Sequence, residues 1–294
     1  MVPRWKLKVV RDAIKACLPL QPMLRIMARY LRPYQDNQGN TRFAFEQGLE
    51  QLLDLRAARL PISGIVLEFG SGWMPIIPIL FYLAGADEAI LTDIERLMDQ
   101  RTIERAKFFV RSNLACVAQT LGTDEGKLSK RLTTFAPSYL VPWEPSTMRP
   151  ASVDIVISRA AFEHVPPPQL EEFLTQFYRI VRPGGAMCHI VDNSDHWQHH
   201  DHSLSRINFL RFDEHDLWWR IGCFNIQNYQ NRLRHSDYIA LFERTGWKIA
   251  EVSSGEPDAQ CLKDLTTLPL APAFLRYDQT DLAILTSHFV VLRP

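Results

Sequence analysis

The chain has 294 residues, of which 46% are hydrophobic and 22% charged, and its 33 basic residues balance its 33 acidic ones. This composition is that of a folded globular protein and excludes a disordered or fibrous class. Zero net charge gives no overall attraction to nucleic acid, and five scattered cysteines without a CxxC pair favour a reduced, cytoplasmic setting.

Residues 1–60 are predicted to form an N-terminal helical cap, because apolar residues recur at helical spacing over 7–18 and again over 43–60. Residues 1–34 hold eight basic residues and one acidic residue. Such a start can contact an anionic membrane surface peripherally, or it can be a cap with a solvated charged face. Charged residues interrupt any signal peptide, and no run reaches membrane-spanning length, so neither export nor a transmembrane helix is expected.

From residue 62 onward, short apolar runs alternate with helical stretches, which predicts an α/β fold with a doubly wound, mostly parallel sheet. The seven predicted strands are 65–68, 89–92, 132–135, 154–158, 186–191, 248–253 and 287–292. The predicted helices are 75–83, 94–114, 168–181 and 236–245. Residues 61–294 are expected to form one domain, in which residues 193–235, rich in His, Trp, Asn and Arg, are a substrate-covering insertion.

A glycine turn follows the first predicted strand. Glu68 ends that strand, Gly70-Ser71-Gly72 form the turn, and a helix begins near Pro75. Glycines allow the backbone to approach a ligand closely, and a helix N-terminus attracts a carboxylate. A nicotinamide-binding fingerprint requires a third glycine where Pro75 stands, so an oxidoreductase is the weaker alternative.

Asp93 ends the next predicted strand, 25 residues after Glu68. A carboxylate there can accept hydrogen bonds from both hydroxyls of a ribose. Alternatively, it caps the following helix.

Two later motifs extend the series: Phe162-Glu163-His164-Val165 follows the fourth strand, and Arg182-Pro183-Gly184-Gly185 precedes the fifth. The ordered series over residues 62–192 resembles the class I S-adenosylmethionine (SAM) dependent methyltransferase family, and the last two strands resemble its antiparallel ending. The glycine turn together with residues 231–238 is similar to a bacterial subgroup of the small-molecule or glycan type, which we associate with glycan gene neighbourhoods. This association names no substrate. The resemblance implies a Rossmann-like methyltransferase fold, S-adenosyl-L-methionine as cofactor and S-adenosyl-L-homocysteine as product.

The resemblance also implies roles for individual residues. Glu68, Gly70, Ser71 and Gly72 would hold the methionine end of the cofactor, with Trp73 directly after them. Asp93 would hold the ribose, and the loop around Pro137 would flank the adenine. Ser158, Arg159 and Ala160 would line the pocket beside the sulfonium.

Methyl transfer to a hydroxyl needs an in-line acceptor and a group that takes the proton. Five of the nine histidines lie between residues 189 and 202. Three interpretations stay open: Asp195 or Asp192 orients His196 as a general base, the segment binds a divalent metal, or it is a solvated loop. His164 is a second candidate base, or it packs behind the cofactor.

Aromatic residues in the insertion could wall an acceptor pocket or form the insertion's own core; they are Trp197, Trp218, Trp219, Phe224 and Tyr229. Arg232 and Arg234 could bind an anionic group or form salt bridges to Glu243 or Asp237. The preferred function is O-methylation of a small-molecule or glycan hydroxyl. N-methylation and a non-catalytic SAM- or nucleotide-binding module are the alternatives. A nucleic-acid methyltransferase is not expected, because Ser158-Arg159-Ala160-Ala161 stands where such an enzyme has its motif after the fourth strand.

Overall fold

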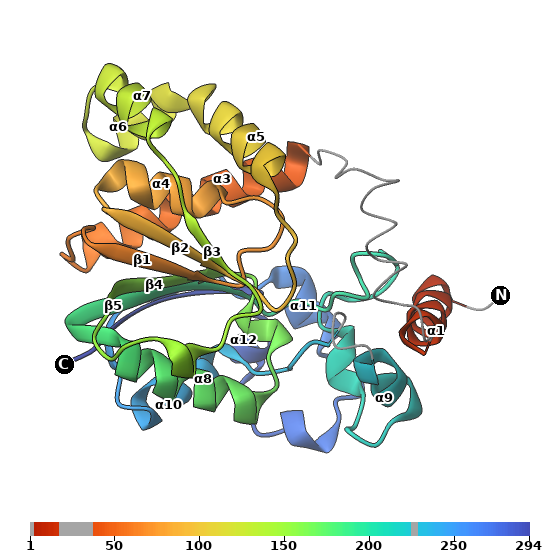
Figure 1. Ribbon diagram of the computed structural model, residues 1–294. Coiled ribbons are helices and arrows are strands. Elements are labelled where there is room, and N and C mark those ends of the chain that lie inside the picture. The colour runs from red at the N-terminus through yellow and green to blue at the C-terminus, as the bar shows by residue number, and fades with distance from the viewer. Residues whose placement is uncertain (1–2, 18–37, 225–228) are drawn as a thin grey trace.

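A seven-stranded sheet forms the centre of the computed structural model, which describes residues 3–17, 38–224 and 229–294 (Figure 1). The strand order is β3-β2-β1-β4-β5-β7-β6. All pairs from β3 to β5 are parallel, whereas β7 is antiparallel to both β5 and β6. The predicted seven-stranded, mostly parallel sheet is therefore confirmed.

The central strands are the most apolar, because helices cover both of their faces. β1 and β4 lie in the middle of the sheet, and Leu67 and Val156 within them are fully buried. The strands are β1 (Ile65–Phe69), β2 (Glu88–Thr92), β3 (Ser138–Leu140), β4 (Val153–Arg159), β5 (Val181–Asp192), β6 (Lys248–Ser254) and β7 (Thr286–Leu292).

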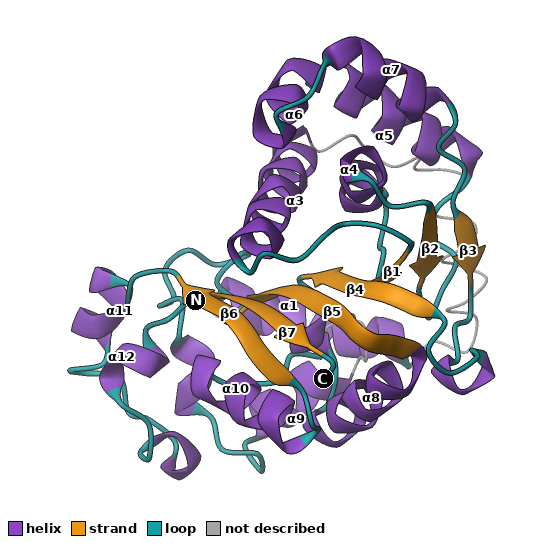
Figure 2. Ribbon diagram, turned by 90° about the vertical axis from the view of Figure 1, so that its left-hand side faces the viewer, coloured by secondary structure: helices purple, strands orange, loops and turns teal. Residues whose placement is uncertain are grey.

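Helices pack on the two faces of this sheet (Figure 2). One face carries α3 (Gln38–Ala57), α4 (Ile76–Ala84), α5 (Gln100–Arg111), α6 (Leu114–Leu121) and α7 (Glu125–Thr133). The opposite face carries α8 (Pro167–Ile180) and α10 (His235–Arg244). Each layer buries its own apolar cluster against the sheet, as a doubly wound fold requires.

A third apolar cluster lies beyond the sheet and joins distant parts of the chain. It contains Trp5 of α1 (Arg4–Ala16), whose indole stacks on Trp197 with ring centroids 4.9 Å apart. Its other elements are η3 (Asn208–Arg211), α9 (Leu217–Phe224), α11 (Ala259–Asp264), η5 (Pro272–Phe274) and α12 (Gln279–Leu282). The insertion therefore has a core of its own, completed by α1 and by the segment between β6 and β7.

The described helices of the predicted N-terminal cap lie in different places (Figure 1). Helix α1 packs against α9, whereas α3 packs against α4 and the sheet. Residues 18–37 of that region lie outside the described residues. No described helix is long and apolar enough to cross a membrane, and peripheral membrane contact through α1 stays a prediction.

The predicted strand at 132–135 is wrong. Leu128 and Leu132 are four residues apart and both buried, since they belong to one face of α7, whose N-cap Asp124 accepts a hydrogen bond from the Lys127 amide. The third strand is instead the short edge strand β3. The helix predicted over 94–114 begins only at Gln100, after the capping box of Asp99, and ends at Arg111.

Candidate functional site

The glycine turn links β1 to α4 at the carboxyl edge of the sheet. Gly70 and Gly72 have φ angles of +72° and +61°, which glycine adopts without strain. Ser71 ties the turn to β2, because its amide donates to the Thr92 carbonyl (2.9 Å) and its hydroxyl accepts from the Thr92 amide (3.2 Å). A Cβ at Gly72 would meet no atom within 4 Å, so this side of the turn is open to a ligand.

Asp93 follows β2 and contacts the turn directly. The Gly72 amide donates to Asp93 Oδ2 (3.0 Å), and the Ile94 amide donates to Oδ1 (2.7 Å). Burial raises the pKa of this carboxyl. The alternative role as a helix cap is wrong, because Asp99 caps the following helix.

Glu68 lies beneath the turn at the end of β1. Its side chain is buried, and its Oε2 has no hydrogen-bond partner among the described residues. Burial raises the pKa of this carboxyl to about 8. An unsatisfied buried acceptor next to an open turn fits the ammonium-bearing end of a SAM molecule, which supplies donors.

The end of β4 approaches the turn from the other side. Ala160 has a φ of +48°, an uncommon conformation for a residue with a Cβ, and its amide donates to the Ile190 carbonyl (2.9 Å). The buried Ser158 hydroxyl is 2.8 Å from Nδ1 of His189 and is thereby engaged in the core. From α3, the Gln51 amide donates to the Ser158 carbonyl (2.9 Å), which fixes this strand end.

Arg159 lies between the glycine turn and the polar residues beyond it. Its Nε donates to Gln47 Oε1 of α3, and its guanidinium lies 5.1 Å from the ring centroid of Phe43. Burial lowers the pKa of Arg159, while the charges of Glu163, Asp192 and Glu68 act in the opposite direction. The positive charge of Arg159 therefore acts both on Glu68 beneath the glycine turn and on Glu163 and Asp192 beyond it.

Two residues predicted to touch the cofactor have different surroundings. Trp73 is 43% exposed. Pro137 immediately precedes β3 and lies at the amino end of that parallel strand, so the structure does not bring it together with the turn at the carboxyl edge. The misplaced third strand caused this error. The loop after β3 is the one that reaches Asp93, since the Trp143 amide donates to the Asp93 carbonyl (3.2 Å), and Trp143 was not predicted.

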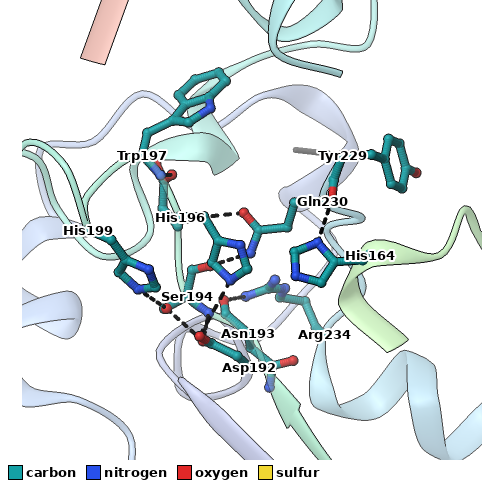
Figure 3. Close-up of polar contacts among 11 residues, drawn as sticks. His164, Asp192, Asn193, Ser194, His196, Trp197, His199, Tyr229, Gln230 and Arg234 are labelled. Carbon is teal, nitrogen blue, oxygen red and sulfur yellow. Dashed lines mark hydrogen bonds and ion pairs between the residues drawn. The ribbon is translucent and has the colours of Figure 1, made fainter. Parts of the chain in front are cut away.

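A polar cluster of Glu163, His164, Asp192 and His196 lies at the same edge. Figure 3 shows its members His164, Asp192 and His196. Nε2 of His196 is 3.4 Å from Asp192 Oδ2, and the rings of His164 and His196 have centroids 5.0 Å apart. Burial would raise the pKa of Asp192, but hydrogen bonds from His196 and Ser194 outweigh it and lower the pKa to about 2. Burial, with the charge of His196, lowers the pKa of His164.

Not every predicted polar residue belongs to this cluster. The Asp195 carboxylate accepts from the Trp197 amide (2.7 Å) and from Asn208 Nδ2 (3.2 Å), so it holds the loop, while Asp192 is the carboxylate beside the His196 imidazole. His189 is buried in β5, and burial lowers its pKa to about 3. The side chains of His199, His200 and His202 are exposed, as a solvated loop predicts.

Glu163 is a cluster member whose role the sequence did not predict. Its side chain is 1% exposed, and neither carboxylate oxygen has a hydrogen-bond partner among the described residues. Burial and the charge of Asp192 raise its pKa well above the ordinary value. Glu163, His164 and His196 each offer one ligand atom within 4.8 Å of the others, so this group could hold a metal ion. The sequence feature that could have revealed Glu163 as a member of the cluster is its position directly before His164.

The aromatic residues of the insertion divide between core and cavity. Trp197 and Trp218 pack on Trp5 in the third apolar cluster. Trp219, Phe224 and Tyr229 line a cavity of about 1040 Å³, and Trp219 also belongs to the third apolar cluster.

Arg232 and Arg234 donate hydrogen bonds to backbone carbonyls. Arg232 donates to the carbonyl of Phe209 (3.3 Å) and to that of Phe212, and its guanidinium lies 3.9 Å from the ring centroid of Trp219. Buried Arg234 donates to the Asn193 carbonyl (3.1 Å). Both guanidinium groups thus have backbone partners in place of the predicted salt bridges.

Solved structures that are similar to this chain include a SAM-dependent methyltransferase from Mesorhizobium loti (12% identity, TM-score 0.45, covering 81% of this chain and 95% of that chain). A SAM-dependent methyltransferase from Methanosarcina mazei is 15% identical, with a TM-score of 0.42 and coverage of 78% and 92%. A third is phosphoethanolamine N-methyltransferase 2 of Haemonchus contortus, solved with phosphomonomethylethanolamine and S-adenosylhomocysteine (17%, TM-score 0.46, 83% and 52%).

None of the curated proteins matches the chain in sequence. Residues 41–252, which include the glycine turn, Asp93 and the polar cluster, match the methyltransferase domain family. The chain belongs to this family and is a SAM-dependent methyltransferase.

Proposed function

We propose that the protein transfers the methyl group of SAM to a hydroxyl of a small-molecule or glycan-linked acceptor. The observation that carries this proposal is the pairing of His196 with Asp192 beside His164, at the carboxyl edge where the cofactor turn also lies. Arg159, in the electrostatic field of both groups of carboxylates, links the two halves of the site. Ligands in open parallel sheets bind outside this edge.

The transfer is a direct displacement at the methyl carbon. A hydroxyl acceptor must lose its proton during the reaction, and imidazole is a suitable acceptor for it near neutral pH. In the metal-free cluster His196 is the candidate base, because Asp192 contacts one ring nitrogen and leaves the other available. An amine acceptor would need less help of this kind, which is why the cluster favours a hydroxyl.

The aromatic cavity supports an acceptor that contains a ring. Tyr229, which lines this cavity, can stack on sugar or aromatic rings. Tyr229 also provides the carbonyl that binds His164 Nδ1 (2.8 Å), so the cavity wall is continuous with the cluster.

The test is methyl transfer from radiolabelled SAM to a panel of hydroxyl and amine acceptors, with release of S-adenosylhomocysteine as a second readout. We expect a hydroxyl compound to be methylated, and His196→Gln to lower kcat by about 10²-fold or more. The control His202→Gln changes an exposed histidine of the same loop and should leave kcat unchanged. Transfer to amines alone, or equal kcat values in both variants, would overturn the proposal.

A further inference from the structure

We propose that Glu163, His164 and His196 bind a divalent transition-metal cation such as Mn²⁺, Fe²⁺ or Zn²⁺, and that the acceptor hydroxyl binds to this cation. The three side chains each offer a ligand atom within 4.8 Å of the others. Two imidazoles and one carboxylate form a ligand set that these metals accept. The inference rests on the proposed function and names the way in which the cluster activates the hydroxyl.

The first observation is the isolation of the Glu163 carboxylate. It is buried, and both oxygens lack a hydrogen-bond partner among the described residues. The surrounding backbone keeps it there, because Asn231 Nδ2 donates to the carbonyls of Phe162 (2.8 Å) and Val165 (2.9 Å), and the Asn231 amide donates to that of Glu163 (2.6 Å). A buried unpaired carboxylate is costly, and a bound cation supplies its missing partner.

The second observation is how the two histidines are held (Figure 3). His164 Nδ1 donates to the Tyr229 carbonyl (2.8 Å), so its Nε2 carries a lone pair. Nε2 of His196 faces Asp192, so its Nδ1 carries one. Metal-binding histidines in proteins have this arrangement, in which the second ring nitrogen donates to a carbonyl or carboxylate.

Other buried polar groups of the chain do not share this pattern. His189 is buried as well, but its ring packs against Phe162 and Phe242 as part of the core. Glu68 has an unpartnered oxygen, yet it lies beneath the cofactor turn and belongs to none of the metal-ligand groups among the described residues. Only at Glu163 does an unpartnered carboxylate meet two imidazoles with available lone pairs among the described residues.

Three protein ligands leave coordination positions for an acceptor oxygen. A cation stabilises the deprotonated form of a hydroxyl bound to it, as it does for bound water, and the proton passes to solvent. The oxygen then forms a bond to the methyl carbon while the carbon–sulfur bond breaks, and the sulfur keeps the electron pair as SAM becomes S-adenosylhomocysteine. In this loaded state His196 is a ligand, and the cation replaces it in activating the hydroxyl.

The first experiment titrates the EDTA-stripped, full-length protein with MnCl₂ by calorimetry. We expect one Mn²⁺ per chain, with an affinity that falls about tenfold or more in Glu163→Gln and in His196→Gln. The control His202→Gln should bind as the wild type does. SAM affinity, measured on the same samples, should be unchanged in all three variants, which shows that they are folded. Equal Mn²⁺ binding in all of them, or none in the wild type, would overturn the inference.

A second measurement does not depend on the folding of the variants. Co²⁺ added to the stripped wild type should give visible absorption bands of a site with nitrogen ligands, and bands of the hexaaqua ion alone would contradict the inference. Methyl transfer to a hydroxyl that persists at full rate in EDTA would overturn the metal role while leaving the proposed function intact. Stoichiometric metal binding without methylation of any hydroxyl would overturn the proposed function while leaving the metal site intact.

Discussion

Glu68 and Asp93 end neighbouring parallel strands, yet their carboxylates are held differently. Asp93 accepts hydrogen bonds from the backbone of the glycine turn and of its own loop, whereas one oxygen of Glu68 has no partner among the described residues. An acidic residue at the end of each strand was visible in the sequence. The difference between them was not, because it depends on the path of the turn above them.

The unsatisfied Glu68 carboxyl gives the ligand-free protein a pH-dependent stability. Burial raises its pKa from 4.5 to about 8, so between these values the folded state holds a proton that the unfolded state has lost. The stabilising contribution is complete below about pH 4.5 and is lost as the pH rises through about 8. We expect Tm to fall between pH 5 and 9, and to fall less in Glu68→Gln, as scanning fluorimetry can measure. An equal fall in Glu68→Gln and in the control Glu256→Gln, which changes an exposed carboxylate, would contradict this account.

A substitution at Gly72 has two effects that can be measured separately, one on stability and one on SAM affinity. Gly72→Ala adds a Cβ that meets no protein atom, so it should cost only about 1 kcal/mol of unfolding free energy from the left-handed φ of +61°. The same methyl occupies the space that we assign to the cofactor, so SAM affinity should fall about tenfold or more. Gly122 is a matched control, because it has a φ of +65° and equally open surroundings at the end of α6.

Chemical denaturation and calorimetry with SAM check both variants. Gly122→Ala should lose similar stability and bind SAM normally. If Gly72→Ala also binds SAM normally, the cofactor does not approach this turn as we infer.

Helix α1 completes the core of the insertion. The Trp5 indole packs against Trp197 and Trp218, and its amide donates to Asp201 Oδ2 (3.2 Å). We expect Trp5→Ala to lower the unfolding free energy by about 3 kcal/mol through the cavity it leaves. Hydrogen exchange should increase in residues 197–219, while the sheet stays protected.

Leu7→Ala is the control for this prediction, because Leu7 lies on the same helix and is 58% exposed. Its effect should stay within about 0.5 kcal/mol. Equal effects of the two substitutions would mean that α1 does not pack on the insertion in solution.

The elements that the sequence predicted well are those whose pattern is local. The buried runs of β1, β2, β4 and β5 were placed within a few residues at most edges, since short apolar segments bounded by turns are typical of parallel strands. β3 was missed because it has three residues at the edge of the sheet, and the apolar spacing of Leu128 and Leu132 belongs to a helix. The third apolar cluster was also missed, because contacts far apart in sequence create it.

The fold brings two predicted groups of residues to one edge of the sheet. The glycine turn and Asp93 meet across neighbouring strands, and His164 meets His196 from loops after β4 and β5. Sequence could place these residues at strand ends, where a parallel sheet collects its ligands. It could not show that Asp195 turns into its own loop, or that Glu163 is buried without a partner, because both depend on side-chain packing.

Calorimetric titration of the purified protein with SAM and S-adenosylhomocysteine tests whether this chain binds SAM at the glycine turn and Asp93. The comparison variant is Asp93→Asn. The control is Asp278→Asn, which changes an exposed carboxylate at the N-cap of α12 that makes no side-chain capping hydrogen bond. We predict saturable binding of one ligand per chain, weakened by about 1–3 kcal/mol in Asp93→Asn through the loss of charge-assisted hydrogen bonds, and unchanged in the control. Absence of binding to either ligand in folded wild-type protein would contradict the account.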